Sequence, residues 1–265
     1  MFIRKLSSTT AFVAVDLADC PGHGVVRSAP KILQGGAKDL ARSVTYTLAC
    51  LERQETGISA GISAPKETKN EAIKHFATEL AGWDAGYSLT AGKGVSGDAV
   101  ASTDHGAVWQ SVVAAAQVVC PDATTAVTDL PAPTDLVVAL AGTGISLVAS
   151  EKPFETAADI LFVGSKMRVL DHDIADRLKV KAVVPVTRLA LTTRGLARCT
   201  SRGVVVAPDF VSAAGALLGA EVAATTRTLL TDLVDHPAGP VMGACLQAEK
   251  FLQTWQESLP FGRPL

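Results

Sequence analysis

The stretch GVVVAPDFV at residues 203–211 decides the fold class of this chain. Its continuous apolar and β-branched run is typical of a strand buried on both faces, and the proline that follows ends the strand because proline has no N–H to donate. Similar runs occupy residues 159–163 (DILFV) and 182–186 (AVVPV). Such strands, separated by helical segments, indicate an α/β protein with a parallel sheet covered on both faces.

The rest of the chain extends this alternation. Further strands are expected at residues 10–15, 87–91, 124–127 and 145–149, and the strand at 87–91 is expected to continue as a loop to residue 97. Helices are expected at residues 37–52, 69–80, 107–119, 134–140, 171–178, 221–234 and 242–259. Residues 19–24 have turn chemistry, and the glycine-rich TGISAGIS at residues 56–63 is unlike a packed strand interior. A boundary between two α/β parts is expected near residues 104–106.

Composition excludes several classes of protein. The 265 residues are 48% hydrophobic and 19% charged, with a net charge of −2, so no basic field exists to bind nucleic acid or an anionic membrane. No apolar run reaches the ~20 residues that a membrane span needs, and the first residues are interpreted as a strand, not a signal peptide. The five cysteines are scattered and predict reduced, cytoplasmic thiols; no metal site is legible.

Several segments match one family in matching order. Residues 24–27 (GVVR) look like a Gly-Gly-Thr-Arg segment, and residues 40–46 (LARSVTY) like a Leu-Ala-Lys-Gly-Met-Thr-Tyr helix. Residues 65–72 resemble the turn and helix start that follow that family's glycine-rich segment, and residues 87–91 (YSLTA) are similar to Tyr-Ile-Thr-Ala. Residues 203–211 look like Gly-Ile-Val-Tyr-Ala-Pro-Asp-Tyr. Together these segments resemble the Glu/Leu/Phe/Val dehydrogenases over most of residues 10–235.

The resemblance implies a two-part architecture. Residues 1–104 would form a substrate-binding and dimerisation-type α/β domain, residues 105–240 a truncated Rossmann-like domain, and residues 241–265 a closing helix. It also implies a homo-oligomer, most simply a dimer.

The family's functional residues do not carry over. Thr47 stands where the resemblance expects the first substrate lysine, and Ile58 or Ser59 where it expects the catalytic lysine. Gly92 and Lys93 follow Thr-Ala where the family has Glu and then the catalytic aspartate. The lysine and the acid/base carboxylate of oxidative deamination are therefore missing.

The nucleotide-binding turn is also missing. Only a few residues separate the helix at 107–119 from the strand at 124–127, which resembles the family's second Rossmann strand with Asp129 at its acidic end. The first strand, the phosphate turn and its helix are therefore expected to be deleted. Gly142 and Gly144 lie between a helix and a strand, the wrong order for a phosphate turn. No cofactor is expected.

A substitute site is predicted from charged residues at family-equivalent positions. The candidate catalytic residues are Glu55, Glu52 and Lys93, and the candidate substrate-binding residues are Arg27, Arg53, Arg188 and Tyr87. Arginines suit a carboxylate-bearing ligand, and a desolvated glutamate suits a general base. The alternatives stay open: a solvated helix end for residues 52–55, a surface loop for Lys93, an ion pair for Arg188 and burial for Tyr87. Asp209 is expected to cap backbone N–H groups of the turn that follows it.

Three functions follow from the sequence. The first is a non-redox enzyme that acts on an amino acid, keto acid or related small carboxylate by imine or enamine condensation, cyclisation, isomerisation or hydrolysis. The second is a non-catalytic ligand-binding pseudoenzyme or partner subunit. The third is an NAD(P)-dependent amino-acid dehydrogenase with an unorthodox cofactor site.

Overall fold

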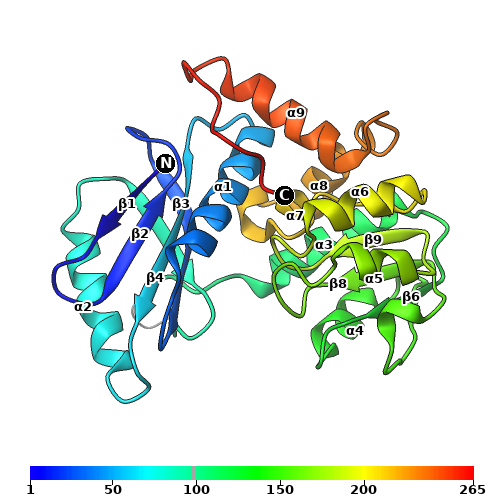
Figure 1. Cartoon of the computed structure of the whole chain (residues 1–265), viewed down its shortest axis with the longest axis horizontal. Helices are drawn as coiled ribbons and strands as arrows, with labels where there is room; N and C mark the ends of the chain where they lie inside the picture. Colours follow the sequence, from blue (N-terminus) through cyan, green and yellow to red (C-terminus); the bar gives the residue numbers. More distant parts are fainter. Residues whose placement is uncertain (97–99) are drawn as a thin grey trace. The chain divides into compact units, whose positions relative to one another are not determined.

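Two five-stranded sheets organise the residues that the computed structural model describes, 1–96 and 100–265 (Figure 1). Unit 1 comprises Met1–Thr103 and Ala248–Pro264, and unit 2 comprises Asp104–Gln247 together with Leu265. The loop predicted after residue 91 ends at Gly97, which lies outside the described residues. Among the described helices, none has the length and apolar character that a membrane span requires.

The sheet of unit 1 is mixed. Its strands are β1 (Phe2–Lys5), β2 (Ala11–Val15), β3 (Gly22–Ala29), β4 (Thr56–Ser63) and β5 (Tyr87–Ala91). They lie in the order β1-β2-β4-β3-β5, with β3 parallel to both β4 and β5, and β2 antiparallel to β4 and β1.

Helices α1 (Gln34–Cys50) and α2 (Lys69–Ala81) cover opposite faces of this sheet (Figure 1). Alternate β4 residues, among them Ile58 and Ile62, pack with Phe76 of α2 in one apolar cluster. The intervening Gly57 faces α1, where an added Cβ would lie 1.8 Å from the carbonyl oxygen of Ala41.

Two expectations about unit 1 were wrong for the same reason. Residues 56–63 form the buried central strand β4, and residues 22–24, expected as a turn, begin β3. Their glycines serve close packing: a Cβ on Gly24 would lie 1.7 Å from the carbonyl oxygen of Ile58. The small residues at these positions allow neighbouring backbone to approach closely, and they are therefore not signs of turns.

The C-terminal part of α9 (Pro240–Leu252) and the segment after it belong to unit 1. Arg42 of α1 forms a buried ion pair with Asp16, at 2.6 Å, and also donates to the carbonyl oxygens of Phe261 and Gly262. Tyr46 donates to Glu249 at 3.0 Å. These bonds tie the C-terminal segment to α1.

The sheet of unit 2 is entirely parallel. Its strands are β6 (Thr125–Thr128), β7 (Ser146–Leu147), β8 (Ile160–Val163), β9 (Ala182–Pro185) and β10 (Val205–Val206), in the order β10-β9-β8-β6-β7. Its helices are α3 (His105–Val119), α4 (Thr134–Leu140), α5 (His172–Arg177), α6 (Thr193–Ser201), α7 (Asp209–Ser212) and α8 (Val222–Thr231), with short 3₁₀ turns at Pro153–Glu155 and Gly215–Leu218.

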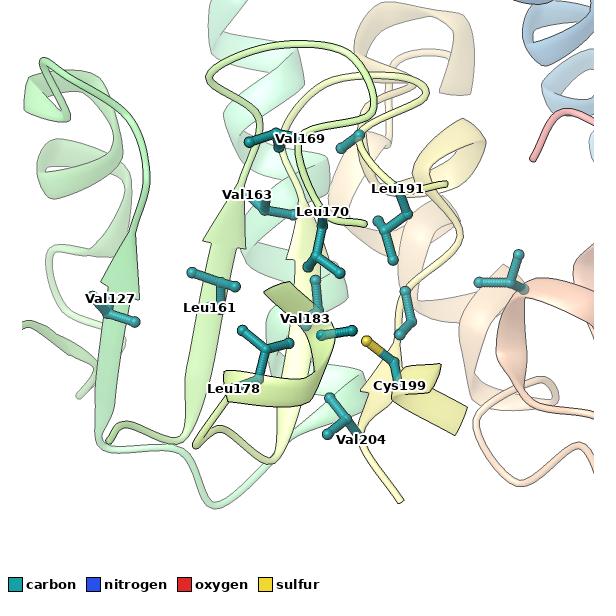
Figure 2. Packing of buried hydrophobic residues seen from close by; sticks show 14 residues of the cluster. Val127, Leu161, Val163, Val169, Leu170, Leu178, Val183, Leu191, Cys199 and Val204 are labelled. Atoms are coloured by element: carbon teal, nitrogen blue, oxygen red, sulfur yellow. The ribbon is translucent and has the colours of Figure 1, made fainter. Parts of the chain in front are cut away.

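A buried apolar cluster lies between this sheet and helices α5 and α6 (Figure 2). Val127, Leu161 and Val183 project from three adjacent strands toward Leu178 and Cys199. On the other face, Ser111 of α3 donates to the Ser212 carbonyl at 2.7 Å, and Ser212 donates to the Pro185 carbonyl at 2.7 Å. Helices therefore cover both faces, as the apolar strands predicted.

The strand order corrects the expected deletion. Strand β6 is followed by α4 and β7, and the chain then crosses to the other side of β6 to form β8, β9 and β10 in succession. In a doubly wound sheet the chain reverses direction across the sheet at the first strand, with the second strand on one side and the fourth on the other. Strand β6 has β7 on one side and β8 on the other, so it occupies the first position and not the second. Relative to the order 3-2-1-4-5-6, the missing strand is the third, because the connection from β7 to β8 contains only the 3₁₀ turn at Pro153–Glu155.

Candidate functional site

The β3 side of unit 1 presents a polar stripe. Exposure alternates strictly along β3, with His23, Val25 and Arg27 half-buried and their neighbours buried. His23 pairs in register with Gly57, so these three side chains lie on the face that carries α1. Helix α1 packs mainly on β4 and β2. The stripe on β3 therefore stays partly open.

Arg27 is the cation of this stripe. Its Nη2 lies 3.5 Å from Ser59 Oγ, and its Nε is buried without a hydrogen-bond acceptor. Burial lowers the pKa of Arg27 from its ordinary value. Of the residues that the structure describes, no Asp or Glu forms an ion pair with it. A half-buried guanidinium in this state can receive a carboxylate from a ligand.

Lys93 lies at the same end of the sheet. It follows Gly92, where an added Cβ would lie 3.0 Å from Arg27 Cγ, so the glycine lets the chain pass close to the arginine. The Lys93 carbonyl accepts the N–H of Ser28 at 3.0 Å, and the residue is exposed. The structure thus brings two predicted site residues, Arg27 and Lys93, to neighbouring chain segments.

Glu55 and Arg53 form a second cluster with His23. Glu55 Oε2 lies 2.5 Å from Arg53 Nη2 and 3.2 Å from His23 Nε2, and Arg53 Nη2 lies 3.2 Å from the same His23 nitrogen. Burial lowers the pKa of His23; Glu55 acts against this shift, and Arg53 adds to it. A neutral imidazole next to a carboxylate is an arrangement suited to proton transfer.

The two clusters are separate. His23 and Arg27 are four residues apart on one strand, which corresponds to roughly 13 Å at 3.3 Å per residue. Glu55 precedes β4, so its cluster lies at the amino end of the parallel strands, whereas Lys93 follows the carboxyl end of β5. The predicted base and the predicted carboxylate holder therefore lie on the same stripe without touching.

Two predicted residues lie away from the stripe. Glu52 is exposed at the end of α1 with φ +54°, where its N–H donates to the Ala49 carbonyl and the next N–H to that of Leu48, a helix-terminating pattern. Tyr87 lies on the α2 face, edge-on to Trp83 with ring centroids 6.5 Å apart.

Arg188 belongs to unit 2, where it lies close to Asp209. Burial lowers the pKa of Arg188 to about 10 and raises that of Asp209 to about 6, and each group's charge opposes the other's shift. Asp209 also accepts backbone N–H groups of Leu189, Ala190 and Phe210. Of the turn that follows Asp209, only the Phe210 N–H is bound; the carboxylate mainly holds the earlier loop at Leu189 and Ala190, so the predicted turn-capping role is only partly met. Arg188 takes part in an internal charge pair.

The carboxyl edge of unit 2 is where a doubly wound sheet binds a dinucleotide. A fingerprint Gly-x-Gly-x-x-Gly would occupy the six residues after β6, but residues 129–134 read DLPAPT. Pro131 and Pro133 have no N–H to offer a phosphate, and Asp129 places a negative charge where a pyrophosphate would lie. The residues present do not fit a dinucleotide.

Asp129 instead binds the neighbouring loop. Its carboxylate accepts the N–H of Gly164 at 2.8 Å, the N–H of Ser165 at 3.2 Å and the hydroxyl of Ser165 at 2.6 Å. These bonds link the carboxyl ends of β6 and β8 at the point where the strand order reverses. We name Asp129, Gly164 and Ser165 the clasp. Its donors are already satisfied by a carboxylate of the chain itself.

Solved structures of known proteins share this architecture. The L-tryptophan dehydrogenase of Nostoc punctiforme is 15% identical, with 96% of this chain and 95% of that chain covered and a TM-score of 0.72. The hetero-hexameric glutamate dehydrogenase of Thermus thermophilus is 18% identical, with 92% and 83% covered and a TM-score of 0.76. The chain has the fold of the amino-acid dehydrogenases. A glutamate dehydrogenase of Plasmodium falciparum is 12% identical, with 94% and 80% covered and a TM-score of 0.72.

At these identities the likeness concerns the fold. No family model matches the sequence, and no curated protein matches it either. The amino-acid dehydrogenase scaffold expected from the short segment matches is nevertheless confirmed.

Sequence reasoning missed His23 and the bonds of Asp129. His23 lies between two glycines, which read as a turn, although the strictly alternating accessibility of β3 directs its side chain to the same face as Arg27. Asp129 was recognised at a strand end, but its strand was placed second in the Rossmann order instead of first. An acid directly after a buried strand, followed by prolines, was the available signal.

Proposed function

We propose that this chain is a non-redox enzyme that acts on an amino acid, a keto acid or a related small carboxylate by proton transfer. The observation that carries the proposal is Arg27, a half-buried guanidinium on the open stripe, unpaired with any described acid. Arg27 binds the substrate carboxylate, and Lys93 adds positive charge at the same end of the sheet.

His23 is the proton-transfer group of this proposal. Its lowered pKa keeps the imidazole neutral near pH 7, and Glu55 orients the ring and stabilises the imidazolium that forms. Arg53 holds Glu55 in place. Glu55, expected from the sequence as the base itself, acts here through the histidine.

The spacing of the stripe limits the substrate. With its carboxylate on Arg27, the substrate extends along Val25 toward His23, so an elongated carboxylate fits better than the smallest ones. Removal of a proton beside a carbonyl or imine suits condensation, cyclisation or isomerisation. The residues at 129–134 support chemistry without a nicotinamide, since they lack the glycines and N–H groups of a phosphate turn.

Solvent deuterium exchange tests the proposal without knowledge of the product. We expect the protein in D₂O to exchange carbon-bound protons next to the carbonyl of one or more 2-oxo acids, monitored by NMR. Arg27→Gln should raise the substrate KM about tenfold or more through loss of a charge-assisted contact, whereas His23→Gln should lower kcat. Arg177→Gln, at an exposed arginine of unit 2, is the matched control.

Other results would redirect the assignment. Ligand-linked thermal stabilisation by carboxylates without exchange would indicate a binding protein, and stabilisation by NAD(P) would indicate a dehydrogenase. Either result would overturn the proposal.

We also propose a homo-oligomer, most simply a dimer. The Thermus protein is described as hetero-hexameric, which supports assembly on this scaffold. Light scattering of the purified chain should give about twice its mass of 27.4 kDa; a monomer across the concentration range would contradict the expectation.

A further inference from the structure

Unit 2 contains a cavity that the proposed function does not use. It has a volume of about 500 Å³ and lies between α3, α4 and α8. Its apolar lining comprises Trp109, Val113 and Ala114 of α3, Val138 and Ala139 of α4, and Ala223 of α8. Small-molecule sites typically have volumes of roughly 300–1,000 Å³ and are lined in this way.

Small side chains leave this space open. Gly106, Ala114, Ala139 and Ala223 border the cavity, where larger side chains would fill the space between the helices. Val138 is 69% exposed, and Trp109 is only half-buried. Apolar surface left in a hollow costs free energy in water, and such a hollow marks a place for an apolar group.

Two opposite charges border the same cavity. Asp135 comes from the first turn of α4 and Arg227 from α8. Arg227 donates through Nη2 to Gln117 Oε1 on α3, at 2.9 Å, which holds the guanidinium beside the opening. In the part of the chain that the structure describes, neither residue forms an ion pair.

We infer that this cavity binds an α-amino acid with a large apolar side chain. Arg227 receives the carboxylate, Asp135 receives the ammonium group, and the side chain enters between Trp109, Val113 and Val138. The argument rests on the cavity of unit 2 and is independent of Arg27 and of the proposed proton transfer.

A ligand series tests each part of the recognition. In calorimetric titrations of the full chain we expect L-phenylalanine to bind with one site per chain. Loss of the ammonium group in 3-phenylpropionate, or of the carboxylate in 2-phenylethylamine, should weaken binding about tenfold or more. L-Alanine, which lacks the apolar group, should not bind detectably.

Variants locate the site. Trp109→Ala and Arg227→Gln should each weaken L-phenylalanine binding about tenfold. Arg227 is exposed, so Arg227→Gln should fold normally. This variant therefore still tests the site if Trp109→Ala does not fold. Arg194→Gln, an exposed arginine on α6, and Arg27→Gln should leave the affinity unchanged. Absence of L-phenylalanine binding, or an affinity that responds to Arg27→Gln but not to Arg227→Gln, would overturn the inference.

Discussion

The β3 stripe of unit 1 and the carboxyl edge of unit 2 treat their polar groups in opposite ways. On the stripe, Arg27 keeps a guanidinium with no described acid beside it. At the edge of unit 2, three donors of the clasp are bound by Asp129. One sheet leaves its charge available, and the other satisfies its donors within the chain.

This difference distinguishes the two sheet regions as places for an anion: the β3 stripe has an open position beside Arg27, whereas the carboxyl edge of the unit 2 sheet does not. Removal of glycines alone would weaken nucleotide binding, but it would also leave unsatisfied N–H groups at the strand ends. The carboxylate of Asp129 accepts these N–H groups. It carries a negative charge and accepts hydrogen bonds, as the phosphate of a bound nucleotide would. The N–H groups at the edge are thus satisfied without a nucleotide, whereas the guanidinium of Arg27 on the stripe has no anionic partner among the described residues.

The largest expected effect comes from breaking the support of the stripe. Gly57→Ala places a methyl group 1.8 Å from the Ala41 carbonyl oxygen and 2.5 Å from the Thr45 nitrogen, both in the backbone of α1. Because backbone cannot rotate away as a side chain does, we expect a loss of about 3 kcal/mol or more in the free energy of unfolding. Urea denaturation measures it.

The control for this substitution lies on α1, the helix that Gly57 contacts, but outside that contact. At Gly35 of α1 an added Cβ meets nothing within 4 Å, so Gly35→Ala should be neutral or slightly stabilising. Hydrogen exchange should show the damage of Gly57→Ala in unit 1 and not in the sheet of unit 2. Equal damage in both units would show that they do not unfold separately.

The second effect comes from opening the clasp. Asp129→Ala leaves the N–H groups of Gly164 and Ser165 without their acceptor, which should cost about 2 kcal/mol. Formate or phosphate should restore part of that stability by occupying the vacated position, whereas the wild-type protein should not respond. Thermal denaturation with and without the anion measures both quantities, with exposed Asp122→Ala as the control. A variant that no anion rescues would mean that the clasp is ordinary loop bonding and not an internal anion site.

The sequence predicted the class of the fold because buried parallel strands have a distinctive apolar pattern. Residues 159–163 and 182–186 were placed as β8 and β9 to within one residue. The prediction failed at β4, where Gly57 packs against the backbone of α1. The residue pattern of a strand does not contain information about the element that packs against it. It also misplaced β6, because strand position in a sheet depends on contacts between residues far apart in the sequence.

The candidate site was predictable in parts. Arg27 was found through a matching segment, and Glu55 through its position after α1. The grouping was not predictable, because it depends on strand register: that of β3 against β4 brings Glu55 to His23, and that of β3 against β5 places Tyr87 beside Gly22 on the α2 face. A shift of one residue in either register would exchange the two faces.

The third effect sharpens the description of the stripe through its pH dependence. Burial lowers the pKa of His23, so the imidazole loses its proton below the ordinary value of about 6.5. If His23 is the base, exchange should fall about tenfold per pH unit below that lowered pKa and be constant above it. Because Glu55 raises the pKa of His23, Glu55→Gln should move the falling limb to lower pH. His75→Gln, an exposed histidine of α2, should leave the profile unchanged; a profile that His23→Gln leaves intact would remove His23 from the mechanism.

The smallest effect separates the two glutamates that the sequence could not distinguish. Glu52 has φ +54°, a left-handed conformation that glycine adopts at lower cost, at the position after a helix end where glycine is preferred. Glu52→Gly should therefore stabilise the protein by about 0.5–1 kcal/mol, whereas Glu71→Gly, inside α2, should destabilise it by about 1 kcal/mol. Both variants should retain deuterium exchange, since neither residue lies in the described contacts of the stripe. A stable Glu52→Gly protein that has lost exchange would return Glu52 to the catalytic role and extend the open, ligand-accepting part of unit 1 to the end of α1.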